Sequence, residues 1–258
     1  MSAAHALPAD AADFNLRDFG GYGTRSGARI RTGLLYRAAE LDRAGPGYHA
    51  LLTQLGADHV VDFRGDAERE SDRGPAFNGF AGTVLTADVE DDTIPHALGA
   101  LFNAAGAGAV AAQMMSVYAA LPFSPRFRQA LGLWFQALDR GNGASLVHCF
   151  AGKDRTGLAV ALLQLMLGVN RDDVFHEYLL TNAMGAGRLA AGIAGLRRQA
   201  SAALDDSMLH EMMLVRPDYL ATALAEIRQA ATDPARYVRS VSGLDDRALA
   251  RLEARLLA

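Results

Sequence analysis

The ten residues His148–Gly157 read "HCFAGKDRTG" and hold the only cysteine of the chain, Cys149, with Arg155 following after five intervening residues. The run "SLVHC" (145–149) is short and apolar, which predicts a strand, and residues 156–167 predict a helix. This order places "FAGKDR" in the turn between strand and helix. Backbone N–H groups in such a turn can gather above the helix N-terminus and bind an anion.

The side chains of this turn suit attack on a phosphate. Cys149 would be the nucleophile, Arg155 would hold two phosphate oxygens through its planar guanidinium, and the helix dipole would favour the thiolate. Thr156 could donate a hydrogen bond to the sulfur. The other residues expected to bind substrate are His148, Phe150, Ala151, Gly152 and Lys153. The alternative for a single cysteine at a strand end is a small buried apolar side chain.

The GK pair in the turn also invites comparison with the nucleotide-binding pattern G-x-x-x-x-G-K-[ST]. That pattern fails, because Val147 stands at its first glycine and Asp154 follows Lys153. Lys153 then has two interpretations, a solvated side chain or a second phosphate contact.

The composition is that of an ordinary globular protein. Of the 258 residues, 50% are hydrophobic and 21% are charged, which suits one large domain, and we place no boundary within 1–258. The net charge of -4 provides no chain-wide positive field, so nucleic acid is not an expected partner. One cysteine excludes an internal disulfide.

The distribution of apolar residues bears on location. Residues 1–14 lack the basic and apolar regions of a secretory signal, and the longest apolar stretch, 158–168, is shorter than the roughly 18 residues of a membrane span. We therefore expect no stable membrane insertion, and a protein that is cytoplasmic or exported without a cleavable signal peptide. The sequence carries no signal for the oligomeric state.

Short apolar or β-branched runs predict three further strands, at 34–37, 59–64 and 83–86. Helical patterns lie between the strands. The clearest covers 126–140, where five apolar residues recur three and four positions apart: Phe127, Leu131, Trp134, Phe135 and Leu138. Strands that alternate with helices predict an α/β domain with a largely parallel sheet.

After Asn170 the pattern is helical alone. Asp172 or Asp173 is the expected N-cap of the next helix, and Pro217 and Pro234 stand where proline opens a helix.

Two segments have an unusual composition. Residues 96–115 are rich in Ala and Gly, with Leu98, Leu101 and Phe102 at helical spacing, and "DDSMLHEMML" (205–214) carries methionines at positions 208 and 212. Each segment is either a buried helix face or an adaptable apolar surface over a ligand cleft.

The stretch His148–Gly157 resembles the signature of a known family. H-C-x-x-G-x-x-R-[ST]-G is the phosphate-binding signature of the cysteine-dependent protein-tyrosine phosphatases, and "HCFAGKDRTG" looks like their bacterial branch, which acts on phosphotyrosine, phosphoserine/threonine and phosphoinositides. Other segments resemble further landmarks of the family, in the family's order: "NLRDFGGY" (15–22), "GLLYRAAEL" (33–41), "VVDFRGDAERE" (60–70), "EYLLTN" (177–182) and "RPDYLATAL" (216–224). The resemblance covers nearly the whole chain.

The resemblance implies the phosphatase fold, with a central sheet, helices on both faces and helical lids over a cleft. Segments 96–115 and 185–213 fall where such lids would be. Charged residues match recurrent positions of the family, and we expect them to be mainly paired scaffold residues, because buried charges require partners. They are Arg17, Asp18, Arg37, Asp62, Arg64 and Glu68.

A leaving oxygen benefits from a proton as its bond to phosphorus breaks, so a carboxyl group should stand near the turn. Many tyrosine phosphatases supply it from a Trp-Pro-Asp loop, but here the only tryptophan, Trp134, is followed by Phe135 and Gln136. Two candidates remain. Asp154 lies inside the turn, where the resemblance implies an acid, and Asp88 lies just after the third predicted strand, where it could instead be a solvated or capping residue.

The sequence therefore predicts a phosphomonoester hydrolase that works through a phosphocysteine intermediate, without metal or cofactor. The expected partner is a phosphoprotein or phosphoinositide substrate. Three alternatives have weaker support. A phosphate-binding module without catalysis typically lacks the cysteine or the arginine, an arsenate reductase with an internal thiol relay needs further cysteines, and a sulfurtransferase has no obvious use for Asp154.

Overall fold

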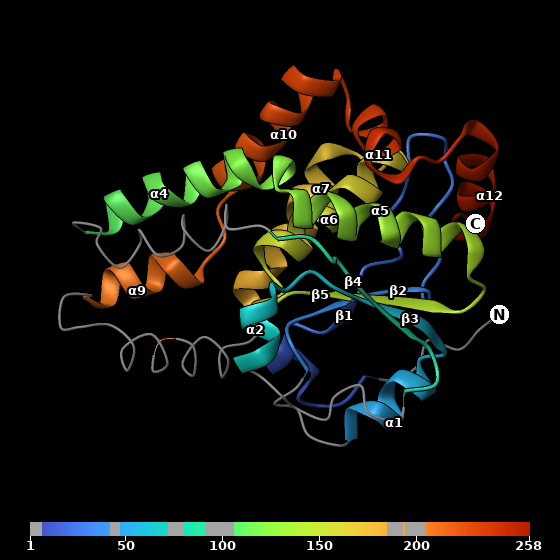
Figure 1. Ribbon diagram of the computed structural model, residues 1–258, viewed down its shortest axis with the longest axis horizontal. Coiled ribbons are helices and arrows are strands. Elements are labelled where there is room, and N and C mark those ends of the chain that lie inside the picture. The colour runs from blue at the N-terminus through green and yellow to red at the C-terminus, as the bar shows by residue number, and fades with distance from the viewer. Residues whose placement is uncertain (1–6, 42–46, 72–79, 91–105, 185–192, 194–204) are drawn as a thin grey trace.

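The computed structural model describes residues 7–41, 47–71, 80–90, 106–184, 193 and 205–258. These residues form a five-stranded sheet in the order β1-β2-β5-β3-β4, with β5 in the middle (Figure 1). The strands are β1 (Arg17–Asp18), β2 (Leu35–Ala38), β3 (Ala57–Asp62), β4 (Thr83–Thr86) and β5 (Ala144–His148).

The sheet is largely parallel, as predicted. β2 and β3 both pair in parallel with β5, β4 pairs in parallel with β3, and the edge strand β1 pairs antiparallel with β2. β1 was not expected, because two residues are too few to show a period of alternation. Parallel strands end at the same edge of a sheet, so the residues that follow β3, β4 and β5 lie along one edge. Cys149 follows β5 directly.

Side chains alternate between the two faces of the sheet. Val60 and Leu146 pack into a smaller core that includes α1 (Gly47–Gln54), whereas the next residues, Val61 and Val147, belong to a larger core on the other face. Figure 1 shows α1 on one side of the sheet and the main helical layer on the other. The expected helices on both faces are confirmed.

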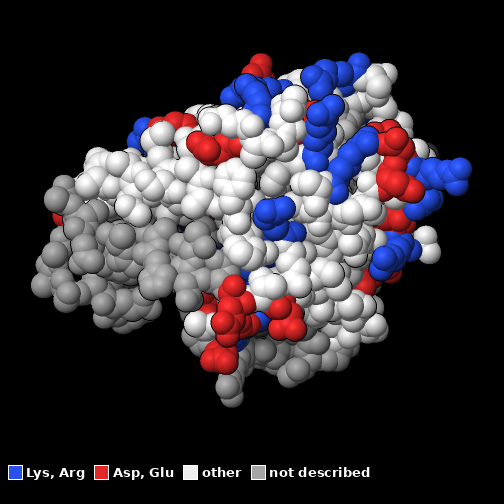
Figure 2. All heavy atoms as spheres, turned by 45° about the horizontal axis from the view of Figure 1, so that its top comes forward, with Lys and Arg blue, Asp and Glu red and all other residues white. Residues whose placement is uncertain are grey.

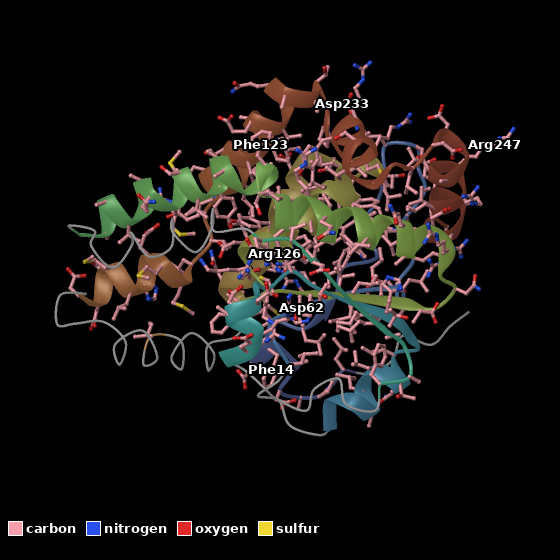
Figure 3. The ribbon with its side chains drawn as sticks, in the orientation of Figure 1. Phe14, Asp62, Phe123, Arg126, Asp233 and Arg247 are labelled. Carbon is pink, nitrogen blue, oxygen red and sulfur yellow. The ribbon has the colours of Figure 1, made fainter. Side chains whose placement is uncertain are left out.

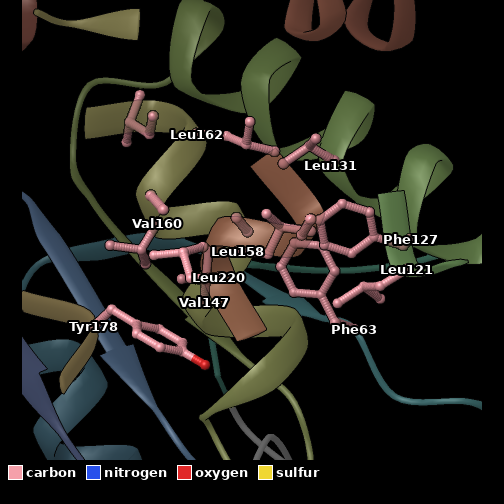
Figure 4. Packing of buried hydrophobic residues seen from close by; sticks show 14 of the residues in the cluster. Phe63, Leu121, Phe127, Leu131, Val147, Leu158, Val160, Leu162, Tyr178 and Leu220 are labelled. Carbon is pink, nitrogen blue, oxygen red and sulfur yellow. The ribbon is translucent and has the colours of Figure 1, made fainter. Parts of the chain in front are cut away.

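The larger core joins the sheet to α5 (Pro125–Arg140), α6 (Asp154–Met166), α7 (Arg171–Ala183), α10 (Pro217–Ala231), α11 (Pro234–Ser242) and α12 (Asp246–Leu256). Figure 4 shows part of it, including Phe63 after β3 and Phe127 of α5. The rings of these two residues stack with their centroids 5.5 Å apart. The shorter elements of the described ranges are α2 (Asp66–Ser71) and the 3-10 helices η1 (Ala11–Phe14) and η4 (Leu121–Phe123).

The predicted helix at 126–140 is confirmed as α5, and its five predicted apolar residues are all buried. Pro217 and Pro234 open α10 and α11, as expected. The predicted N-cap of α7 is wrong. The cap is Asn170, whose side chain accepts a hydrogen bond from the backbone N–H of Asp173 at 2.9 Å. Asp172 and Asp173 instead occupy the first turn, where their negative charges interact favourably with the positive end of the helix dipole.

The predicted lid segments are described only in part. α4 (Ala107–Ala120) contains the end of segment 96–115, and α9 (Asp206–Met213) contains the end of segment 185–213. The remainder of both segments, apart from residues 106, 193 and 205, lies outside the described residues. α4 and α9 are in contact and lie side by side in Figure 1. Met208 and Met212 are buried.

Among the described helices, none combines the length and the apolar character that crossing a membrane requires.

Candidate active site

The loop that follows β5 turns at Gly152, and α6 begins at Asp154, two residues earlier than predicted. Gly152 has a φ of +62°, and a Cβ there would lie 2.4 Å from the carbonyl oxygen of Ala38, so a side chain does not fit. The first N–H groups of an α-helix have no partner within the helix, and they bind anions together with the helix dipole. The loop therefore ends on a site suited to phosphate.

The carbonyl group of Gly152 is held by two side chains from distant parts of the chain. Its carbonyl oxygen accepts hydrogen bonds from Asn15 Nδ2 at 2.8 Å and from Arg37 Nη2 at 2.6 Å. Arg37 is completely buried and Asn15 nearly so. Residues that lie over a hundred positions from the loop thus determine its conformation.

Glu177 of α7 links this support to β1. Its two carboxylate oxygens contact Arg17 Nε and Arg37 Nη1, each at 2.7 Å. Burial alone would raise the pKa of Glu177, but the charges of Arg37 and Arg17 outweigh it and hold the pKa below its ordinary value. Burial, and then the charge of Arg37, lower the pKa of Arg17 to about 10. The group is a buried arginine–glutamate–arginine cluster beneath the loop.

Arg155 leaves the first turn of α6 and is held by Glu68 of α2. Nη1 and Nη2 of Arg155 bind the two carboxylate oxygens of Glu68 at 2.5 and 2.6 Å, and Nη1 also donates to the carbonyl oxygen of Phe63 at 3.1 Å. Burial lowers the pKa of Arg155, but the Glu68 charge and hydrogen bond raise it above its ordinary value, with smaller contributions from Cys149 and Asp154. The guanidinium therefore lies within electrostatic reach of the thiol and is fixed in orientation.

Cys149 is 1% exposed at the end of β5. The neighbouring Thr156 is also buried, and its hydroxyl has no hydrogen-bond partner among the described residues, so the expected bond to the Cys149 sulfur is not formed in this structure. His148 is completely buried, and its Nε2 lies 3.8 Å from Asp62 Oδ1. Phe150, by contrast, is exposed.

Asp154 is in contact with helix α4. The hydroxyl of Tyr118 donates to Asp154 Oδ1 at 2.7 Å, and the hydroxyls of Tyr118 and Tyr178 lie 2.7 Å apart. Lys153 Nζ lies 3.2 Å from the same Oδ1. This candidate acid is therefore fixed by residues of α4, α7 and the loop.

The solvated interpretation of Lys153 is wrong, because the residue is only 6% exposed. Its ammonium group donates to the carbonyl oxygen of Leu214, just after α9, at 3.3 Å. The only lysine of the chain thus joins the loop to the connection between α9 and α10.

Asp88 lies at the same edge of the sheet, after β4, and is exposed. Its backbone N–H donates to Gln129 Oε1 at 2.7 Å. Within the described part of the chain, no hydrogen bond or ion pair joins its carboxylate to Asp154, Lys153 or Arg155. The structure does not bring the second candidate acid into the group around Asp154.

The expected charge pairs are mostly confirmed. Arg17 and Arg37 pair with Glu177, and Arg64 pairs with Asp62 at 2.9 Å. Figure 3 shows Asp62 and Arg126 among the side chains at this end of the sheet.

Two charged residues differ from the expectation of scaffold pairs. Asp18 has no ion pair within the described residues. It accepts hydrogen bonds from the backbone N–H groups of Gly20 at 2.8 Å and Gly33 at 2.5 Å, because the turns beside β1 leave these donors without other partners. Glu68 has an ion pair, but with Arg155, so it belongs to the site.

Sequence reasoning missed Asn15, Tyr118, Glu177 and Tyr178 as residues around the loop. Asn15, Glu177 and Tyr178 lie in segments that resemble family landmarks, and this resemblance was the only available signal. Tyr118 lies in none of these segments, and only the packing of α4 shows its role.

The described residues contain no group of three or more His, Cys, Asp or Glu side chains able to hold a metal ion. On the face in Figure 2, basic and acidic side chains are interspersed.

Comparison with known proteins places this geometry in context. The model of the tyrosine phosphatase family matches residues 11–258. A Cupriavidus necator protein assigned to the tyrosine-protein phosphatases is 32% identical over 234 residues, which cover 90% of this chain and 82% of the relative. The triple specificity protein phosphatase PtpB of Mycobacterium tuberculosis is 29% identical over 262 residues, which cover 88% of this chain and 92% of PtpB.

Proposed function

This chain belongs to the tyrosine phosphatase family, and on that basis we propose that it hydrolyses phosphate monoesters through a phosphocysteine formed on Cys149. The Cys149 thiolate attacks phosphorus, a sulfur–phosphorus bond forms, and the bond to the leaving oxygen breaks. Water then attacks the phosphocysteine, which releases phosphate and restores the thiolate. Arg155 and the N–H groups at the start of α6 stabilise the phosphoryl oxygens in both steps.

The observation that carries this proposal is the two-pronged contact between Arg155 and Glu68, with N–O distances of 2.5 and 2.6 Å, beside the cysteine at the end of β5. Phosphoryl transfer depends mainly on positioning and on charge aimed at the transition state. A guanidinium already fixed in orientation loses little entropy when it binds phosphate. The geometry therefore supports catalysis and not merely anion binding.

We propose that Asp154 is the acid that donates a proton to the leaving oxygen. Its carboxylate lies in the first turn of α6, next to Arg155 in sequence, whereas Asp88 has no described contact with this group. In the first step Asp154 gives its proton to the leaving oxygen, and in the second the resulting carboxylate accepts a proton from the attacking water.

The proposed substrates are phosphotyrosine first, and phosphoserine/threonine and phosphoinositides in addition. The wider range rests on the motif and on the likeness to a phosphatase named for triple specificity. Lys153 supports the phosphoinositides, because a compact ammonium in the loop suits a second phosphate outside the reach of Arg155. We treat 1–258 as a single phosphatase domain, with α4 and α9 as the described parts of its lids.

The proposed mechanism is tested first by Cys149→Ser. This variant should lose turnover on a phosphotyrosine peptide and keep the affinity for phosphate, because Arg155 and the helix N-terminus remain. Steady-state assays and calorimetric titration with phosphate measure the two properties. Turnover near the wild-type rate would contradict the mechanism, and phosphate binding without turnover in the wild-type protein would favour the non-catalytic alternative.

Replacement of each candidate acid by Asn separates their roles. Asp154→Asn should slow hydrolysis of esters with poor leaving groups far more than of esters with good ones, because good leaving groups need little protonation. Asp88→Asn is the matched control and should affect both kinds of ester equally. The rates over a series of aryl phosphates measure this dependence, and the opposite ranking would move the role to Asp88.

A further inference from the structure

Asp154 is held by a tyrosine that comes from a different part of the chain. We propose that Tyr118 of α4 is a positioning residue for Asp154, which fixes one carboxylate oxygen and stabilises the charge that forms there when the acid gives up its proton. This inference rests on the role of Asp154 proposed above. The described contacts of the Tyr118 side chain are with Asp154, Tyr178 and Tyr219, and not with Cys149 or Arg155.

The direction of the hydrogen bonds follows from the number of protons available. Tyr118 has one hydroxyl proton and gives it to Asp154 Oδ1 at 2.7 Å, so the hydroxyl of Tyr178, 2.7 Å away, must donate to the Tyr118 oxygen. Burial, and then the charge of Asp154, raise the pKa of Tyr118 well above its ordinary value. Tyr118 therefore remains a donor throughout the range in which enzymes are assayed.

Both described contacts of the Asp154 carboxylate fall on Oδ1. Tyr118 donates a hydrogen bond to this oxygen and Lys153 forms an ion pair with it, whereas Oδ2 accepts no hydrogen bond from the described residues. The side chain of Asp154 is 20% exposed, so Oδ2 remains available to the substrate. One oxygen is thus held in place while the other can transfer a proton.

The contacts on Oδ1 favour the ionised carboxylate, which is the form that appears as the reaction proceeds. When Oδ2–H protonates the leaving oxygen, negative charge develops on Asp154, and donors already in place stabilise it without reorganisation. Four groups act on this charge: Tyr118 of α4, Lys153 of the loop, Arg155 of α6 and Tyr178 of α7. Tyr118 is the one that α4 contributes.

The Tyr118 ring is fixed independently of its hydroxyl. It stacks on Tyr219 of α10, with centroids 5.4 Å apart and planes inclined by 28°, and meets Tyr178 edge to face at 6.4 Å. Replacement by phenylalanine keeps these contacts and removes only the hydrogen bonds. Tyr118→Phe therefore separates the role of the hydroxyl from the packing of α4.

The test compares Tyr118→Phe with two other variants of the full chain. Tyr219→Phe is the matched control, because the Tyr219 hydroxyl binds Glu211 instead of Asp154 and the Tyr219 ring stacks on the Tyr118 ring. Asp154→Asn reports on the acid itself. For each variant, kcat and KM are measured for a series of aryl phosphates with good and poor leaving groups.

We expect Tyr118→Phe to lower kcat for poor leaving groups about tenfold or more, since it removes a hydrogen bond to a charged group. The loss should be smaller for good leaving groups. The slope of log kcat against the pKa of the leaving group should therefore be steeper than in the wild-type protein. Tyr219→Phe should change neither property.

The outcomes distinguish this inference from the proposal beneath it. If Asp154→Asn shows no dependence on the leaving group, the role of Asp154 fails and the role of Tyr118 fails with it. If Asp154→Asn shows the dependence but Tyr118→Phe behaves like Tyr219→Phe, the inference alone is overturned. An equal loss on all esters, with the leaving-group slope unchanged, would reduce Tyr118 to a structural residue and would also overturn the inference.

Discussion

Arg155 depends on a second residue, Glu68, for its orientation. Both terminal guanidinium nitrogens of Arg155 bind Glu68, and the carbonyl oxygen of Phe63 accepts a further hydrogen bond. Burial would raise the pKa of Glu68, but the Arg155 charge and hydrogen bond hold it below its ordinary value. Glu68 is therefore ionised at neutral pH and acts on the reaction through Arg155.

Glu68→Gln keeps the size of the side chain and removes its charge. We expect kcat to fall about tenfold, because the guanidinium loses one charged contact and some of its fixed orientation. Arg155→Lys should cost more, about 2.7 to 4 kcal/mol of transition-state stabilisation, since an ammonium cannot make the two-pronged contact. Steady-state kinetics on a phosphotyrosine peptide measure both losses.

Asp66→Asn is the control for Glu68→Gln. Asp66 lies on the same helix, α2, but its carboxylate pairs with Arg126 and Arg69 instead of Arg155. If Asp66→Asn and Glu68→Gln reduce kcat equally, the effect comes from loss of α2 packing, and the specific support of Arg155 is contradicted.

The residues of the loop itself were predictable because they are contiguous. Cys149, Asp154 and Arg155 lie within one ten-residue motif, and the residues of this motif taken together predict a phosphate site. Tyr118 and Glu177 were not predicted as partners, because their contacts depend on how α4 and α7 pack. A lone buried tyrosine or glutamate carries no local signal for such a contact.

Among the secondary-structure elements, strands and helices with strong periodicity were predicted well. β4 has the expected bounds, and α5 begins one residue before them. The start of α6 was placed two residues late, because Asp154 and Arg155 look like loop residues in the sequence although they form the first helical turn. Element ends depend on capping and on tertiary contacts, which periodicity does not show.

Lys153 connects the loop before α6 to the segment between α9 and α10. All other basic residues among the 25 are arginine, so this position alone uses the compact ammonium. Its partners are oxygens of Leu214 and Asp154. A second phosphate on the substrate would offer a further oxygen ligand to the same group.

Lys153→Ala should lower kcat/KM for phosphoinositides several-fold more than for a phosphotyrosine peptide. Lys153→Met is the matched variant, because it keeps most of the side-chain length and removes only the charge. Phosphate-release assays with both substrates measure the selectivity. Equal losses on both substrates, in both variants, would make Lys153 a general support of the loop and would remove it from lipid recognition.

At the level of the whole molecule, we expect the buried residue His59 to make the stability of the fold sensitive to acid. His59 is 3% exposed near the amino end of β3, and its Nε2 has no hydrogen-bond partner among the described residues. Burial, followed by the charge of Arg255, lowers its pKa to about 4. The folded protein therefore holds His59 neutral, while the unfolded chain takes up a proton below a pKa of about 6.5.

This difference in pKa between the folded and unfolded states determines how stability changes with pH. Stability from His59 is complete above about pH 6.5 and is lost as pH falls toward about 4, because only the unfolded chain binds the proton in that interval. The free energy of unfolding should fall by about 2 kcal/mol between about pH 7.5 and pH 5. The buried carboxylates with lowered pKa values, such as Asp62 and Glu177, lose their contribution only at lower pH.

Urea unfolding at the two pH values measures this loss, and His59→Gln should remove most of it. His176→Gln is the control, since His176 lies on the exposed surface of α7. Equal pH dependence in the wild-type protein and in His59→Gln would show that His59 is not the source.

The most direct test of the account is the detection of phosphate on Cys149 during turnover. The wild-type protein is mixed with a slight deficiency of an aryl phosphate that has a good leaving group, quenched with acid at successive times within one turnover, and analysed by peptide mass spectrometry. We predict that phosphate appears on the peptide with Cys149 as the aryl group is released, that it then disappears, and that Cys149→Ser shows none. Phosphate on another residue, or complete turnover without phosphocysteine at any time, would contradict the account.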